Sequence, residues 1–158
     1  MFARALGVLI AVAAVTAPIA SAAKTRRTFV VTKVEANKSW QKVRLTLGGR
    51  GTIRFKAAGK WIFNPSQPAV GGDGAGNLST AGRTSYTFSG SDGREGQLIG
   101  KIGRGAPFVA GAHGMHDVRP NEIGRLYLMI NDDYKQSAGA GLADNSGHLR
   151  VRIDYERR

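Results

Sequence analysis

The stretch HLRVRIDY, residues 148–155, alternates apolar and polar side chains along its whole length. Its apolar members fall on one side of an extended chain and its arginines on the other: Leu149, Val151, Ile153 and Tyr155 against Arg150 and Arg152. A period of two residues is typical of a β-strand with one buried face. The stretch therefore predicts a strand of a sheet that has one buried face and one solvent-exposed face, with the arginines on the exposed face.

Several other runs show strand patterns. RTFVVTKV at 27–34 predicts a first strand, and VRLTL at 43–47 and TIRFKA at 52–57 alternate as 148–155 does. RLYLMIN at 125–131 is apolar on both faces, which predicts a strand that is covered on both sides or lies near a sheet crossing.

The connections between these runs are rich in glycine, and no stretch of helical period follows the first residues. Seven or more short strands with frequent turn signals predict an all-β protein, a β-sandwich of two antiparallel sheets. The segment 64–92 is the least strand-like and is interpreted as a long functional or poorly ordered loop.

The N-terminus has the layout of a secretory signal peptide. Residues 1–22 contain Arg4, an apolar run, and small residues at Ala20 and Ala22 before the expected cleavage. The remaining residues, 23–158, are expected to form one domain that is secreted or periplasmic. The alternative is an uncleaved membrane anchor. The chain has no Cys, so it can form no disulfide, and a lipid-anchored lipoprotein is excluded.

The chain is strongly basic, with 23 Lys and Arg against 11 Asp and Glu. Such a charge favours anionic partners such as lipopolysaccharide, acidic glycans or nucleic acid. A nucleic-acid role is not predicted, because aromatic residues are not interleaved with the basic ones as in single-strand binders. The alternative function is a cationic envelope protein that holds anionic glycan or lipopolysaccharide on one basic face, formed by Arg44, Arg54, Lys56, Arg150 and Arg152, with any calcium purely structural.

Three of the 11 acidic residues gather in one loop, NDDYKQSAGAGLADNSG at 131–147. Its candidate oxygen ligands are the carboxylates of Asp132, Asp133 and Asp144 and the amides of Asn131 and Asn145. Calcium takes six to eight oxygen ligands of these kinds, and glycines at 139, 141 and 147 allow sharp turns. The loop does not have EF-hand spacing. A calcium site and a polar turn whose side chains cap backbone groups are both consistent with this composition.

Three stretches resemble the calcium-dependent galactophilic lectin family of bacteria, the PA-I group: GQLIGKIGRGAPFVAG at 96–111, GRLYLMINDD at 124–133 and ADNSGHLRVRI at 143–153. A fainter match covers 51–74. The resemblance implies a jelly-roll-like sandwich with one calcium ion (Ca²⁺). It implies the side chains of Asp132, Asp144 and Asn145 and the carbonyls of Gly141 and Phe63 as metal ligands.

The resemblance also implies that two vicinal sugar hydroxyls complete the calcium shell. Candidate carbohydrate-binding residues are Asp132, Asp144, Phe63, Asp73, Asn77 and Trp61. The family's sugar-contacting His and Gln are missing from 71–86, so the partner is a galactose-like sugar or another glycan. Multivalent binding would make a homo-oligomer useful.

Catalysis finds little support in the sequence. Ser137 and Ser146 lack a nucleophile-elbow motif, and Asp132 and Asp144 suit a cation cage better than a glycosidase pair. The pair His113 and His116 is interpreted as part of an exposed loop rather than a metal site. The protein is predicted not to be an enzyme.

Overall fold

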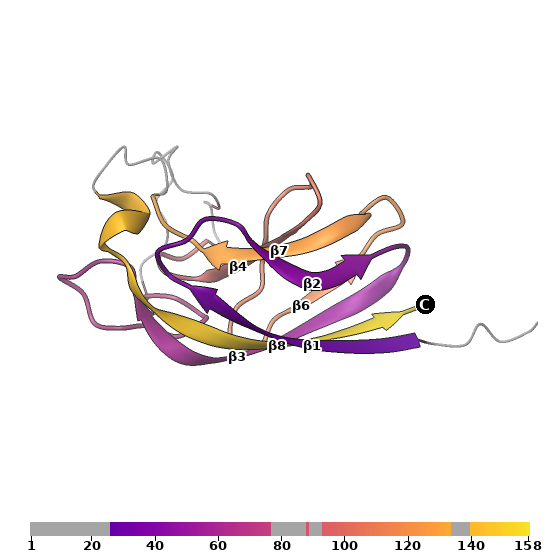
Figure 1. Cartoon of the computed structure of the whole chain (residues 1–158), viewed down its shortest axis with the longest axis horizontal. Coiled ribbons are helices and arrows are strands. Elements are labelled where there is room, and N and C mark those ends of the chain that lie inside the picture. The colour runs from indigo at the N-terminus through magenta and orange to yellow at the C-terminus, as the bar shows by residue number, and fades with distance from the viewer. Residues whose placement is uncertain (1–25, 77–87, 89–92, 134–139) are drawn as a thin grey trace, which may run out of the picture.

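A computed structural model describes residues 26–76, 88, 93–133 and 140–158. The predicted signal peptide at 1–22 and the candidate Asn77 lie outside these residues. The described chain forms two antiparallel four-stranded sheets that pack face to face (Figure 1). The predicted all-β sandwich is confirmed.

The two sheets are named here after their longest inner strands. The β8 sheet has the order β1-β8-β3-β6, formed by β1 (Arg26–Glu35), β8 (Ser146–Arg157), β3 (Gly51–Ile62) and β6 (Met115–Val118). The β7 sheet has the order β2-β7-β4-β5, formed by β2 (Gln41–Leu47), β7 (Gly124–Ile130), β4 (Leu98–Ile102) and β5 (Phe108–Val109). A single 3₁₀ turn, η1 (Gly141–Asp144), precedes β8.

β8 is the centre of its sheet because it pairs along its length with two long strands. β1 pairs from Arg26↔Arg157 to Glu35↔His148, and β3 pairs from Gly51↔Arg157 to Ile62↔Ser146. Burial alternates along β8, with Leu149 and Val151 inside and Arg150 outside. The strand predicted from residues 148–155, with its arginines in water, is confirmed.

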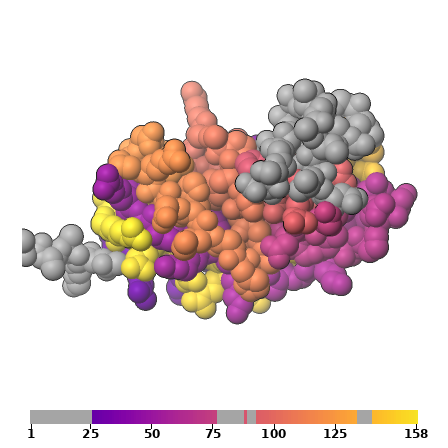
Figure 2. All heavy atoms as spheres, turned by 180° about the vertical axis from the view of Figure 1, so that it is seen from behind, coloured from indigo at the N-terminus to yellow at the C-terminus, as the bar shows by residue number. Residues whose placement is uncertain are grey.

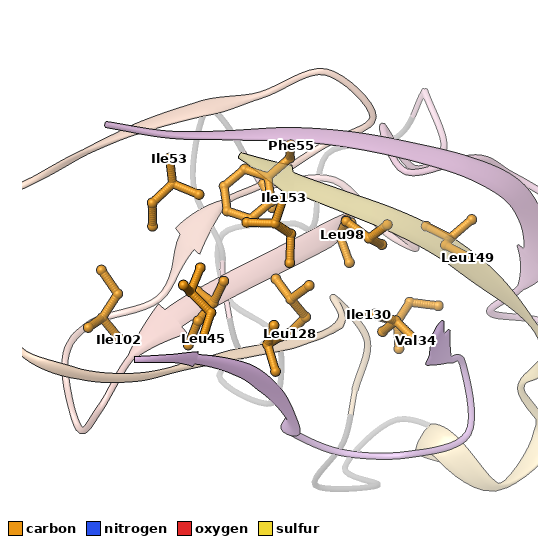
Figure 3. Packing of buried hydrophobic residues seen from close by; sticks show 14 of the residues in the cluster. Val34, Leu45, Ile53, Phe55, Leu98, Ile102, Leu128, Ile130, Leu149 and Ile153 are labelled. Carbon is orange, nitrogen blue, oxygen red and sulfur yellow. The ribbon is translucent and has the colours of Figure 1, made fainter. Parts of the chain in front are cut away.

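The core lies between the two sheets. Leu149 and Ile153 of β8 face Leu128 and Ile130 of β7, and all four side chains are fully buried (Figure 3). Burying a Leu or Ile side chain contributes about 1.5–3 kcal/mol relative to leaving it exposed. With no disulfide to help, this apolar layer is the main source of stability.

The second half of β7 is buried on both faces, as its sequence predicted, whereas Arg125 is exposed and Tyr127 is half-buried. Leu128 and Ile130 point into the core, while Met129 on the opposite face is also fully buried beside its cross-strand partner Ile99. A strand in this position needs no polar alternation, so β7 lacks the exposed arginine rows of β8.

The topology brings the end of β7 and the start of β8 to the same end of the sandwich. η1 lies at this end, away from the C-terminus (Figure 1). In the reverse view, yellow atoms near residues 140–147 and magenta atoms of the chain after β3 lie at the same end (Figure 2). Among the described residues, no helix is long and apolar enough to cross a membrane.

Candidate functional site

The candidate site begins with a buried contact between Asp132 and Asn145. Asp132 is the second residue after β7 and Asn145 directly precedes β8, and each residue is only 5% exposed. The Nδ2 amide of Asn145 donates to Oδ2 of Asp132 at 2.8 Å. Two residues that are 13 positions apart in the sequence therefore meet at one point, as the sequence predicted for the walls of the loop.

The amide of Asn145 also holds the turn after β1. Its Nδ2 donates to the carbonyl of Ala36 at 3.2 Å. Its Oδ1 is buried and has no hydrogen-bond partner. A buried oxygen without a partner is costly, by about 1–3 kcal/mol, and it is the kind of atom that a metal ion would satisfy.

The carboxylate of Asp132 is poorly solvated. Burial raises its pKa from 3.8 to about 6, although hydrogen bonds from Asn145 and the backbone N–H of Asp133 oppose the shift. The neighbouring charges of Asp144 and Asp133 raise the pKa further. A bound cation would reverse this effect, because it stabilises the ionised form.

Asp144 is the last residue of η1 and is exposed to solvent. Gly141 opens η1 with φ +59° and is buried, and Gly147 has φ +84° at the start of β8. Both values lie in the left-handed region that glycine adopts readily. The sharp turns predicted at these two glycines are confirmed, while position 139 lies outside the described residues.

Phe63 reaches the site through the β3–β8 ladder. The last pairs of this ladder are Trp61↔Gly147 and Ile62↔Ser146. Phe63 and Asn145 are the residues directly beyond this last pair, outside both strands. The ring of Phe63 packs against Gly96 in the interior, which leaves its backbone carbonyl as the candidate ligand.

Two other candidates are used structurally. Trp61 is 1% exposed and donates from Nε1 to the carbonyl of Gly96 at 2.7 Å, so its ring offers no face to a sugar. Asp73 is exposed, but its Oδ1 accepts the N–H of Ala112 at 2.7 Å. The backbone of Asp73 forms an isolated antiparallel β-bridge with Gln97. On its other side, the carbonyl of Gln97 accepts the N–H of Asn131.

Two strand spacings therefore separate Asp73 from Asn131, which is about 10 Å. The structure does not bring Asp73 into the Asp132–Asn145 contact.

Asn131 has a structural role that the sequence did not reveal. Its Oδ1 accepts the N–H of Phe88 at 3.0 Å, and its Nδ2 donates to the carbonyls of Phe88 and Arg94 at 2.8 and 2.9 Å. The Asn131 amide is fully used in these hydrogen bonds. Asn131 therefore anchors Phe88 and Arg94, which are distant in sequence, and is not a candidate calcium ligand. Only its position beside two aspartates suggested a ligand.

The donor set fits a calcium ion only if amide and carbonyl oxygens contribute. Among the described residues, no three His, Asp or Glu side chains gather closely enough to hold a metal by themselves. Calcium accepts mixed oxygen ligands. The candidate ligands are such a mixture: the side chains of Asp132, Asp144 and Asn145 and the carbonyls of Gly141 and Phe63. The buried Oδ1 of Asn145, which has no hydrogen-bond partner, is consistent with a role as a metal ligand.

His116 differs from the exposed loop that the sequence suggested. It lies in β6, its ring stacks on Phe108 with centroids 3.8 Å apart, and its Nε2 lies 3.2 Å from the carboxylate of Glu122. Glu122 in turn accepts the N–H of Arg119. These contacts give His116 a packing role.

The predicted basic face is divided between the two sheets. Arg54, Lys56, Arg150 and Arg152 lie on the outer side of β3 and β8, where Lys56 stands directly opposite Arg152. Arg44 is exposed on β2, in the other sheet. The prediction that all five residues share one face is therefore wrong for Arg44, because β2 and β3 belong to different sheets.

Comparison with known proteins does not assign the chain to a family. No protein-family model matches the chain, and no curated protein matches it. The function is therefore argued from the geometry and charge of the chain itself.

Proposed function

We propose that this protein is a calcium-dependent carbohydrate-binding protein, exported from the cytoplasm. The ion would be held at the end of the sandwich where β7 stops and β8 starts. Asp132, Asp144 and Asn145 would supply side-chain oxygens, and Gly141 and Phe63 would supply carbonyls. The sequence resemblance to the galactophilic lectins suggested this ligand set.

The observation that carries the proposal is the buried pair of Asp132 and Asn145. Asp132 is a desolvated carboxylate with a raised pKa, and Oδ1 of Asn145 is buried without a partner. Both features are unfavourable in the protein alone. A hard cation between these groups would stabilise both, since calcium prefers carboxylate and amide oxygens.

Calcium would supply a positive centre that ligates vicinal hydroxyls of a sugar. The chain's own residues would hold the ion and fix its position. Asp144 is the exposed acid of the set, so it stands at the solvent side, where a glycan would approach. Trp61 and Asp73 are not part of the proposed sugar contact, because Trp61 is buried and the carboxylate of Asp73 accepts the N–H of Ala112.

The test combines calcium titration with a glycan array. Calorimetric titration of the chelator-treated protein is expected to show one calcium site, and calcium is expected to raise the melting temperature. Glycan binding on the array should disappear in chelator and persist at 0.5 M salt, since direct ligation is screened less than exposed charge pairs. Absence of calcium binding would overturn the proposal; calcium binding without any glycan signal would leave the ion a structural role.

Replacing Asp144 with Asn tests the ligand set directly. The substitution removes one charge from the cage while keeping an oxygen, so calcium affinity is expected to fall about tenfold. The fold should be unaffected because Asp144 is exposed. Asp117→Asn is the matched control, since it makes the same change on β6, which pairs with the opposite end of β3. Equal calcium affinities for the two variants would exclude Asp144 as a ligand.

A further inference from the structure

The outer face of the β8 sheet carries a dense set of cations. Alternate residues of β1, β3 and β8 point outward, and seven of them are basic: Arg27, Lys33, Arg54, Lys56, Lys60, Arg150 and Arg152. We call this set the basic face. Three carboxylates share the surface, those of Glu35, Asp154 and Glu156.

Like charges stand directly opposite one another on this face. Lys33 is the cross-strand partner of Arg150, and Lys56 is the partner of Arg152. Directly opposed like charges destabilise a sheet, because their side chains leave neighbouring Cα positions about 4.5–5.5 Å apart. A neutral polar residue such as Thr would serve the fold better at these positions, so the repulsion points to a role outside folding.

The carboxylates neutralise only part of the face. Glu156 contacts Arg27 and Arg54, each at 3.5 Å, and Asp154 contacts Arg152 at 3.1 Å. Lys33 contacts Glu35. In the described part of the chain, three cations of the face form no ion pair: Lys56, Lys60 and Arg150.

The three unpaired cations form one group. Arg150 pairs with Ala58 of β3, and Lys56 and Lys60 are the next outward residues on either side of Ala58. Such diagonal neighbours lie about 7–8 Å apart. Arg150 lies at this distance from both lysines, while Lys56 and Lys60 are four residues apart on β3, about 13 Å. Three free cations spread over this length attract an anionic chain rather than a single small ion.

A shallow hollow adjoins this group near the other end of β8. It has a volume of about 550 Å³, and its lining includes the ring of Phe29, the cations Arg54 and Arg152, and their ion-pair partners Glu156 and Asp154. Phe29 is 65% exposed, and the guanidinium of Arg152 lies 5.3 Å from its ring centre. An exposed ring among cations can pack on the apolar side of a sugar while the cations bind its acidic groups.

We propose that the basic face binds an extended anionic polysaccharide, without calcium. Charge complementarity favours a polyanion, and the single exposed ring of Phe29 suits a sugar better than a series of stacked bases, which would need several aromatics. The group Lys56, Lys60 and Arg150 would bind the acidic groups. This surface is distinct from the calcium site, because its cations are exposed on the outer face of the sheet whereas Asp132 and Asn145 are buried at the end of the sandwich. Lys60, the nearest of the three cations, pairs with His148, three residues along the chain from Asn145.

The experiment compares dextran sulfate with neutral dextran, both tested in chelator. The wild-type protein is expected to bind dextran sulfate and not dextran, with affinity that falls as salt is raised. The variant K56T/R150T should bind roughly tenfold more weakly, since each exposed charge contact contributes about 0.2–1 kcal/mol. The control K42T/R44T removes the same charge from β2 in the other sheet and should retain wild-type affinity.

Phe29→Thr measures the contribution of the ring to binding separately from that of the charges. It is expected to weaken binding about threefold while leaving the salt dependence unchanged, because it removes no charge. Equal losses in K56T/R150T and K42T/R44T would overturn the proposal, since net charge alone would then explain binding. Stronger binding to anionic phospholipid vesicles or to DNA than to dextran sulfate would also overturn it. Because chelator is present throughout, failure here leaves the calcium proposal untouched, and the reverse also holds.

Discussion

At the scale of single residues, Asp132 and Asn145 are unusual because the protein keeps them buried at a cost. Asp132 retains a carboxylate with a pKa near 6, and Asn145 leaves Oδ1 without a partner. A polar turn that only capped backbone groups would satisfy these atoms internally. The arrangement therefore favours a bound cation over a simple turn.

The pKa of Asp132 predicts how the calcium-free protein responds to pH. Its folded pKa of about 6 lies above the ordinary value of 3.8, so the folded state binds the proton more tightly than the unfolded state. The contribution of Asp132 to the free energy of unfolding is greatest below pH 4 and is lost as the pH rises through 6. Urea denaturation of the wild type and of Asp132→Asn between pH 4 and 8 measures this difference.

In chelator at pH 7, Asp132→Asn is expected to be about 1–2 kcal/mol more stable than the wild type, because it removes a desolvated charge. The same substitution should abolish calcium binding. Calcium affinity of the wild type should fall below pH 6, where protons compete for the carboxylate. A pH-independent stability difference between the two proteins would show that Asp132 does not titrate as proposed.

At the scale of elements, the start of β8 sets the geometry of the candidate site. Gly147 has φ +84°, and its backbone passes so close to β3 that a Cβ would lie 2.8 Å from the carbonyl of Lys60. This close approach fixes the register of Trp61 against Gly147. The same ladder ends at Ile62↔Ser146, directly before Phe63 on one strand and directly after Asn145 on the other.

Gly147→Ala should disturb both the fold and the site. A left-handed conformation and a backbone clash together are expected to lower the free energy of unfolding by about 2–3 kcal/mol. Calcium affinity should fall as well, because the ladder that places Phe63 is displaced. Gly48→Ala is the control, since its Cβ would meet nothing within 4 Å and its φ is ordinary. Equal stability of the two variants in thermal denaturation would contradict this account.

At the scale of the whole molecule, the sandwich separates its charges. The carboxylates Asp132, Asp133 and Asp144 gather at one end, while the basic face covers the outside of the β8 sheet. Three of the 11 acidic residues thus lie at one end of the sandwich, and seven of the 23 basic residues lie on one face. On the two proposals, an anionic chain and a divalent cation would bind to different parts of the surface.

The opposed cations predict a dependence of stability on salt. Raising NaCl from about 20 to 200 mM shortens the screening length from roughly 20 Å to 7 Å and should raise the melting temperature. K56T/R150T should be about 0.5–1 kcal/mol more stable than the wild type at low salt, with a smaller response to NaCl. Thermal denaturation in chelator measures both effects. A wild-type melting temperature that falls with NaCl would show that the ion pairs of this face outweigh its repulsion.

Much of the fold was predictable from local patterns. The alternation in 148–155 and the apolar run at 126–130 specify one half-buried and one fully buried strand, because side-chain direction in a strand has a period of two. The contact of Asp132 with Asn145 was also predictable, since the two antiparallel strands that flank the loop bring its ends together. Burial of Trp61 and the commitment of Asn131 were not, because both depend on the 88–97 segment, which is distant in sequence.

The sequence by itself determined the strand periodicity, the basic charge and the acidic loop, because each is a property of neighbouring residues. Only the tertiary structure decided which basic strands share a face. It placed Lys33, Lys56 and Arg150 together and put Arg44 on the other sheet. The physical reason is that strand order in a sandwich is set by contacts between residues far apart in the chain, which no local pattern specifies.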